Sequence, residues 1–145
     1  MQNYKDNQLV SDENAIMNIS ILSVIGDRED QQDSFGYLLK KNEGLIVVCD
    51  GMGGHEGGQL ASQLSVKDFV DKYTLIDLIP NPATFMMEVA RECDNKVATL
   101  KKDGLKLNAG TTCVAAIVQK KQLFWCSIGD SRAYLVRNSE FVQLT

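Results

Sequence analysis

The chain has 145 residues, 44% of them apolar, which is enough for one domain with a sizeable hydrophobic core. Its formal net charge of −4 argues against a nucleic-acid partner. No apolar run approaches the roughly 20 residues that span a bilayer, and the polar N-terminus lacks the apolar core of a signal peptide. We therefore expect a soluble cytoplasmic protein with no membrane association.

The first third of the chain predicts short strands. Residues 1–17 are polar and weakly patterned, so we expect them to be flexible or to form an edge strand. Residues 19–25 alternate in polarity as a strand does and end at Gly26. Residues 34–39 and 45–49 predict two more strands joined by a hairpin turn. Short loops between these strands favour an antiparallel meander.

Two helices are predicted next from the spacing of apolar residues. The first runs from residue 57 or 58 to residue 78. The second begins where Asn81 can cap the helix and Pro82 suits its first position. Its apolar residues recur at helical spacing as far as Leu100, and we expect Gly104 to stop it.

The last third predicts strands again, at residues 111–118, 122–128 and 132–136, with a further strand starting at residue 141. Grouped strands with segregated helices indicate an α+β layered domain rather than a parallel α/β sheet. No repeat, low-complexity segment or linker divides the sequence. We therefore expect residues 1–145 to belong to a single domain.

The four cysteines are spread along the chain, and none belongs to a Cys-x-x-Cys pair. Each lies in an apolar strand or helix pattern, where free cysteine behaves as a small hydrophobic residue. A zinc site would need closer spacing and more histidine. We expect all four to be reduced core residues, which fits the cytoplasm. They are Cys49, Cys93, Cys113 and Cys126.

The most informative segment follows the strand predicted at residues 45–49. Asp50 opens a turn that holds five of the chain's eleven glycines and its only histidine, His55. Glycine lets a backbone approach a ligand closely, so a carboxylate beside such a loop suits a hard metal ion and a phosphate. An Asp-Gly pair alone would indicate only a turn. The spacing of the glycines and the absence of a lysine in the segment exclude the common nucleotide-binding loops.

Acidic residues recur at strand ends, in residues 27–33, at Asp50 and at Asp130. Loops at one end of neighbouring strands can converge, and carboxylates brought together repel each other unless a cation neutralises them. Oxygen ligands without a thiolate cluster favour Mg²⁺ or Mn²⁺ over zinc. Arg28 lies among the carboxylates and offers a planar fork for a phosphate. Taken singly, each acidic loop could instead be solvated surface, and Asp130 could belong to a plain hairpin turn.

With these motifs in this order, the chain resembles the N-terminal part of the bacterial metal-dependent protein serine/threonine phosphatases of the 2C class. The resemblance runs from about residue 20 to residue 145, and the Asp-Gly-Met-Gly-Gly-His string is its most specific motif. It implies a four-layer α-β-β-α sandwich of antiparallel sheets, with the C-terminal portion of the domain missing. The matching motifs are Gly26-x-Arg28 leading to Gln32-Asp33, Asp50 to His55 with Gly58 and Ala61-Ser62, Gly110-Thr111-Thr112, and Ile128 to Tyr134.

The resemblance also implies a metal site. Asp50 would bridge two Mn²⁺ or Mg²⁺ ions, and the Gly51 carbonyl would ligate one of them. Asp33 and Gln32 would hold metal-bound water, although the family often has Glu at the position of Gln32. Asp130 would belong to a weaker third metal site. Two further aspartates for the metal pair would come from the C-terminal portion of the domain.

In the same resemblance, Arg28 would bind the substrate phosphate, and His55 would be the general acid that protonates the departing serine or threonine oxygen. The implied function is metal-dependent hydrolysis of phosphoserine and phosphothreonine in proteins by a metal-activated water. The implied partners are phosphorylated proteins, including a serine/threonine kinase and its targets in bacterial signalling. The alternative is a catalytically inactive 2C-like module or fragment that binds phosphoproteins or regulates a partner. A small metal-binding module of unrelated fold is a third reading.

Overall fold

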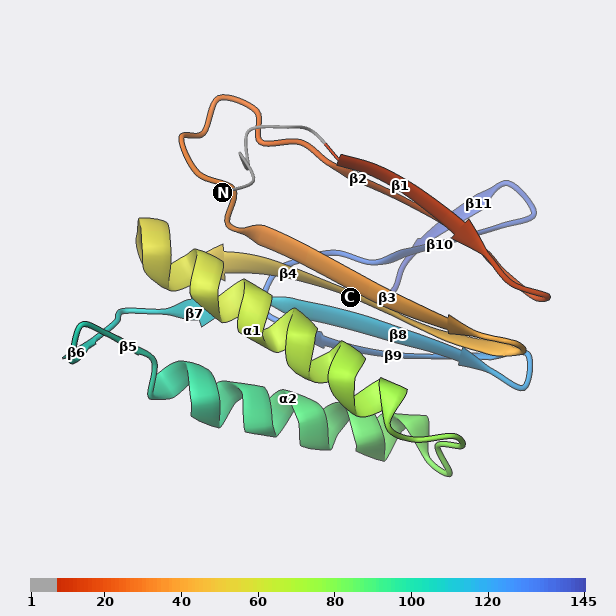
Figure 1. Cartoon of the computed structure of the whole chain (residues 1–145). Helices are drawn as coiled ribbons and strands as arrows, with labels where there is room; N and C mark the ends of the chain where they lie inside the picture. The colour runs from red at the N-terminus through yellow and green to blue at the C-terminus, as the bar shows by residue number, and fades with distance from the viewer. Residues whose placement is uncertain (1–7) are drawn as a thin grey trace.

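The computed structural model describes residues 8–145, and it is layered. Figure 1 shows two helices packed against one face of a central sheet, with two hairpins on the opposite side. The helices are α1 (His55–Thr74) and α2 (Pro82–Ala98). Among the described residues, no helix is long and apolar enough to cross a membrane.

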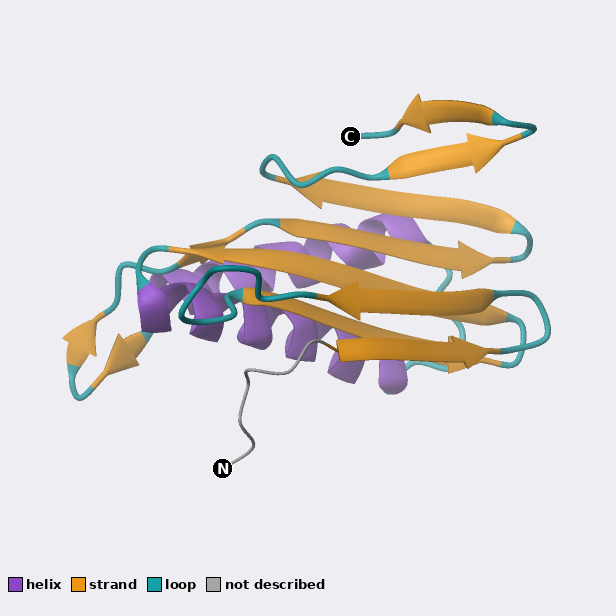
Figure 2. Ribbon diagram, turned by 90° about the horizontal axis from the view of Figure 1, so that it is seen from above, coloured by secondary structure: helices purple, strands orange, loops and turns teal. Residues whose placement is uncertain are grey.

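The central sheet contains four long strands in the order β3-β4-β8-β9, each antiparallel to its neighbour. They are β3 (Asp33–Lys40), β4 (Glu43–Met52), β8 (Cys113–Gln119) and β9 (Gln122–Ile128). A short strand, β7 (Gly110–Thr111), pairs with the C-terminal end of β4. Figure 2 shows the long strands lying side by side with the helices behind them. The predicted α+β class with antiparallel sheets is confirmed.

The remaining strands form three separate hairpins. They are β1 (Gln8–Glu13) with β2 (Asn18–Ser23), β5 (Lys101–Lys102) with β6 (Leu105–Lys106), and β10 (Tyr134–Arg137) with β11 (Glu140–Gln143). The predicted meander is wrong, because β2 pairs with β1 and not with β3. An edge strand was one expectation for residues 1–17, and β1 agrees with it from residue 8 onward. Residues 1–7 lie outside the described residues.

The core lies between the central sheet and the helices. Along β4, Leu45, Val47 and Cys49 are fully buried towards the helices, whereas Val48 is 42% exposed on the other face. Phe69 of α1 is also fully buried in this cluster. Three of the cysteines are buried, the fourth is partly buried, and all are free, so the core interpretation of the cysteines is confirmed.

The start of α2 follows the prediction, because it depends on local chemistry. The Asn81 side chain accepts a hydrogen bond from the Thr84 backbone N–H at 3.1 Å, and Pro82 is the first helical residue. The predicted end is wrong. Helix α2 ends at Ala98, and Gly104, with φ of +80°, instead forms the turn between β5 and β6.

The predicted bounds of α1 are also wrong at both ends, since the helix begins at His55 and stops at Thr74. Leu75 and Leu78, which extended the apolar pattern, are 83% and 58% exposed. These two leucines would gain little burial from a further helical turn, and Ile79 reaches the core from the loop that follows α1.

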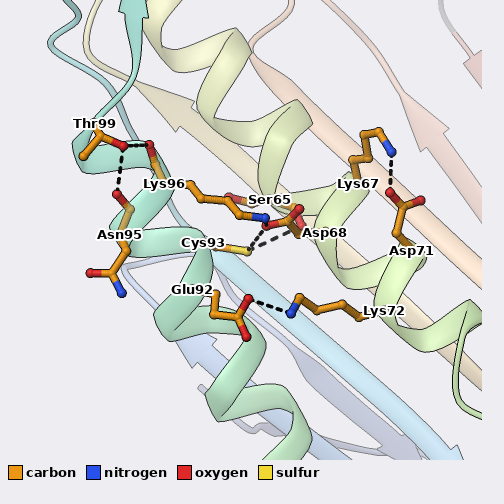
Figure 3. A network of polar contacts seen from close by, with 10 residues as sticks. All are labelled: Ser65, Lys67, Asp68, Asp71, Lys72, Glu92, Cys93, Asn95, Lys96 and Thr99. Carbon is orange, nitrogen blue, oxygen red and sulfur yellow. Dashed lines mark hydrogen bonds and ion pairs between the residues drawn. The ribbon is translucent and has the colours of Figure 1, made fainter.

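Polar contacts join α1 to α2 along their outer sides (Figure 3). Lys96 of α2 pairs with Asp68 of α1 at 2.6 Å, and Lys72 of α1 pairs with Glu92 of α2 at 2.6 Å. The Cys93 thiol lies beneath the first pair, with its Sγ 3.7 Å from Asp68 Oδ2. Burial, reinforced by the charge of Asp68, raises the pKa of Cys93 to about 11, so this thiol stays protonated at neutral pH.

The face of the central sheet away from the helices is only partly covered. Ile19 and Ile21 of β2 are buried there, but Trp125 of β9 remains 44% exposed. Of the four layers expected, residues 8–145 supply one helix layer, the central sheet and the hairpins of the second β side. No helix in this described range covers that second side.

Candidate metal and phosphate site

Asp50 lies inside β4 rather than in the turn after it. The alternation of the strand puts its side chain on the same face as Val48, away from the helices. The strand register pairs Asp50 directly with Asp33, the first residue of β3. Side chains that face each other across an antiparallel pair are close neighbours. The predicted convergence of carboxylates at a strand end is therefore realised for these two residues.

The electrostatics of the pair suit a cation. Burial raises the pKa of Asp33, and the charge of Asp50 and a hydrogen bond with Asp50 act in the same direction. Arg28 opposes them, because its positive charge lowers the pKa of Asp33. A pair of carboxylates in register on neighbouring strands offers oxygen donors of the kind that Mg²⁺ and Mn²⁺ prefer. Arg28 is therefore placed near the carboxylates, where a phosphate could also contact it.

Glycines bring three backbone segments together beside Asp50. A Cβ atom on Gly51 would lie 2.1 Å from the Gly58 carbonyl oxygen, and one on Gly58 would lie 2.4 Å from Gln32 Oε1. The Gly51 N–H donates to the Gln32 carbonyl at 3.1 Å. The start of α1, the end of β4 and the loop before β3 can approach this closely only because these positions have no side chain.

Hydroxyls fix the loop before β3, and sequence reasoning gave them no role. Ser62 on α1 donates to the Gln32 carbonyl at 2.6 Å, and its hydroxyl lies 2.9 Å from that of Ser34. The Gln32 carbonyl is thereby fixed by Ser62 and by the Gly51 N–H, at the start of β3 beside Asp33. The motif containing Ser62 was visible in the sequence, but its contacts with Gln32 and Ser34 join residues about thirty positions apart along the chain.

The backbone of Asp50 is held from the other side by two threonines. Thr112 N–H donates to the Asp50 carbonyl at 2.8 Å, and Asp50 N–H donates to Thr112 Oγ1 at 3.0 Å. Thr111 Oγ1 also donates to the Asp50 carbonyl at 3.0 Å. The Thr112 hydroxyl lies 2.6 Å from that of Ser131.

The other predicted site residues are less closely gathered. Asp130 is exposed in the turn after β9, and Ser131 connects that turn to Thr112. His55 is the first residue of α1, next to the Asp50 segment, and the structure does not describe its side chain. Among the described side chains, which do not include that of His55, no group of three acidic, histidine or cysteine residues is arranged to hold a metal ion. The clustered carboxylates are thus a pair.

A sequence model described as Protein phosphatase 2C matches residues 23–145. The chain belongs to this family. It is 33% identical over 123 residues to the serine/threonine phosphatase stp of Listeria welshimeri, covering 81% of this chain and 49% of that relative. It is also 33% identical to the protein phosphatase PhpP of Streptococcus pneumoniae, covering 89% of this chain and 54% of PhpP.

Solved structures agree with the family assignment. Serine/threonine phosphatase Stp1 from Staphylococcus aureus superposes with a TM-score of 0.74 at 25% identity, covering 99% of this chain and 54% of Stp1. The catalytic domain of the phosphatase PstP, solved in complex with 2 manganese ions, superposes with a TM-score of 0.68 at 25% identity. The superposition covers 97% of this chain and 54% of the PstP chain. This 2C-family chain therefore spans about half the length of the curated relatives it matches.

Proposed function

We propose that this 2C-family chain serves in the metal-dependent hydrolysis of phosphoserine and phosphothreonine in proteins. The observation that carries the proposal is the directly opposed pair of Asp33 and Asp50, with Arg28 close enough to lower the pKa of Asp33. The serine/threonine phosphatases among its relatives support the same reaction.

The metal-holding residues follow from the site. Asp50 and the Gly51 carbonyl would hold two Mn²⁺ or Mg²⁺ ions, and Asp33 and Gln32 would hold the ions through water. Asp130 would serve a third, weaker position. The ions, when bound, would supply an activated water and neutralise phosphoryl charge. The manganese-containing PstP structure supports divalent metals in the family.

The remaining chemistry belongs to two side chains of this chain. Arg28 would hold two phosphoryl oxygens in its planar fork and favour the charge that builds up on them. A serine or threonine alkoxide is a poor leaving group, so a positioned acid accelerates its departure by roughly 10²–10⁴-fold. We assign that proton donation to His55, because histidine is the side-chain type that titrates near neutral pH.

Phosphorylated proteins would be the substrates, and a serine/threonine kinase with its targets would be the signalling partners, in the cytoplasm. The alternative is a non-catalytic 2C module that binds phosphoproteins. Two observations support this alternative. The described carboxylates form a pair rather than a larger cluster, and the chain spans about half the length of its relatives.

Release of phosphate from a phosphothreonine peptide, measured with and without Mn²⁺, tests the proposal. The assay uses this chain and, if the gene continues past Thr145, also the longer encoded protein. We expect Mn²⁺-dependent turnover that Asp50→Ala abolishes. His55→Ala should slow the peptide more than p-nitrophenyl phosphate, whose leaving group needs little protonation. Mn²⁺ binding without turnover in either form would instead establish the binding module.

A further inference from the structure

At Asp50, a side-chain hydrogen bond interrupts the backbone pairing of β4 with β8 and β7. Ladder pairing with β8 extends to Val48 opposite Val114, and pairing with β7 resumes at Gly51 opposite Thr111. Between these stretches, the Asp50 N–H donates to the side-chain hydroxyl of Thr112 at 3.0 Å. A side chain thus takes the place that a backbone carbonyl takes elsewhere in the ladder.

The same hydroxyl reaches a second candidate site residue. Thr112 is 2% exposed, and its Oγ1 lies 2.6 Å from Ser131 Oγ, directly after Asp130. The turn is also packed against Thr112, since a Cβ atom on Gly129 would lie 2.8 Å from Thr112 Cγ2. A continuous path of hydrogen bonds therefore runs from the Asp50 amide through Thr112 to the Asp130 turn.

We propose that the hydroxyls of Thr112 and Ser131 form a positioning relay, which fixes Asp50 in β4 and couples its placement to that of the Asp130 turn. The effect on metal binding rests on the proposed function, but the structural link does not. A ligating carboxylate must be held to within about 0.5 Å, and losing the groups that orient metal ligands typically costs 10–100-fold in metal affinity or activity.

The relay acts through hydroxyls, so variants that keep shape and remove the hydroxyl isolate it. Thr112→Val retains the branched side chain and removes both hydrogen bonds, whereas Thr112→Ser retains the hydroxyl. Ser131→Ala removes only the contact with the turn. Ser65→Ala is the matched control, because the Ser65 hydroxyl is also buried but has no hydrogen-bond partner among the described residues.

Two readouts are compared across these variants: Mn²⁺ affinity by calorimetry, and hydrogen exchange of the Asp50 amide by NMR. We expect Thr112→Val to weaken Mn²⁺ binding by about 10–100-fold and to speed exchange of that amide. Thr112→Ser should behave like the unsubstituted chain, as should the Ser65→Ala control. Ser131→Ala should shift both readouts in the same direction as Thr112→Val, by less.

If the Asp50 amide of Thr112→Val exchanged hydrogen at the unsubstituted rate, the relay would be overturned. It would also be overturned if Thr112→Ser lost as much Mn²⁺ affinity and amide protection as Thr112→Val. A Ser131→Ala chain identical to the unsubstituted one in both readouts would overturn the coupling to the Asp130 turn, and it provides the test if Thr112→Val does not fold. Failure of the proposed function looks different. The unsubstituted chain and Asp50→Asn would then bind Mn²⁺ equally, while amide exchange would still decide whether the hydroxyls hold Asp50.

Discussion

Substituting Gly51 with alanine should damage both the fold and the metal site. The new Cβ atom would lie 2.1 Å from the Gly58 carbonyl oxygen and 2.7 Å from that of Gln32, where ordinary contact begins near 3.4 Å. The backbones must therefore separate by about 1.3 Å, the difference between 3.4 and 2.1 Å. Overpacking of this kind typically costs about 1–3 kcal/mol. For a chain of this size that lowers the melting temperature by roughly 3–12 °C.

Thermal unfolding and Mn²⁺ titration of Gly51→Ala check this, with Gly110→Ala as the matched control. Gly110 lies on the strand opposite Met52, and its added Cβ would meet only the flexible Met52 side chain, at 3.2 Å. We expect Gly51→Ala to lose stability and to bind Mn²⁺ more weakly, because separating these backbones moves the Gly51 carbonyl and Asp50, which are proposed metal ligands. A Gly51→Ala chain as stable as the unsubstituted one, or a Gly110→Ala chain equally damaged, would refute the packing argument.

Three further outcomes are expected from equilibrium urea unfolding. Asn81→Ala should cost about 0.5–2 kcal/mol by removing the cap of α2, and Asn81→Asp, which keeps an acceptor for the Thr84 N–H, should recover most of it. Phe69→Ala should cost about 3–5 kcal/mol because it empties a fully buried core position, while Leu75→Ala, at 83% exposure, should change stability by less than about 0.5 kcal/mol. Asp33→Asn should stabilise the metal-free chain at neutral pH. Because folding raises the pKa of Asp33, ionisation of Asp33 penalises the folded state at high pH, so this gain should shrink as the pH falls through the folded-state pKa and vanish below the ordinary value of 3.8. A gain that is constant with pH would contradict the assigned cause.

Features that depend on neighbouring residues were predictable from the sequence. Asn81 and Pro82 marked the start of α2 because a cap and the first helical residue are adjacent in the chain. The strand at residues 45–49 was also predicted, but β4 continues to Met52, because β7 and the threonines pair with its end. Asp50 is consequently held by a strand rather than by a turn.

Features that depend on distant partners were not predictable. The sequence indicates that residues 34–39 and 45–49 are strands, but the pairing of β4 with β8, more than sixty residues further along the chain, is set by no local pattern. The carboxylate pair was expected from strand ends, yet the direct register of Asp33 with Asp50 is set by the length of the β3–β4 turn. The Thr112 hydroxyl finds its partners 62 and 19 residues away, which no local pattern records.

In the proposed function, Asp33 and Asp50 together hold divalent metal. A calorimetric titration of Mn²⁺ into the unsubstituted chain, Asp50→Asn and Asp33→Asn measures this binding, because each variant keeps the shape and one oxygen of the carboxylate while removing its charge. We expect saturable Mn²⁺ binding that either substitution weakens severely. Equal Mn²⁺ binding by all three chains would contradict it.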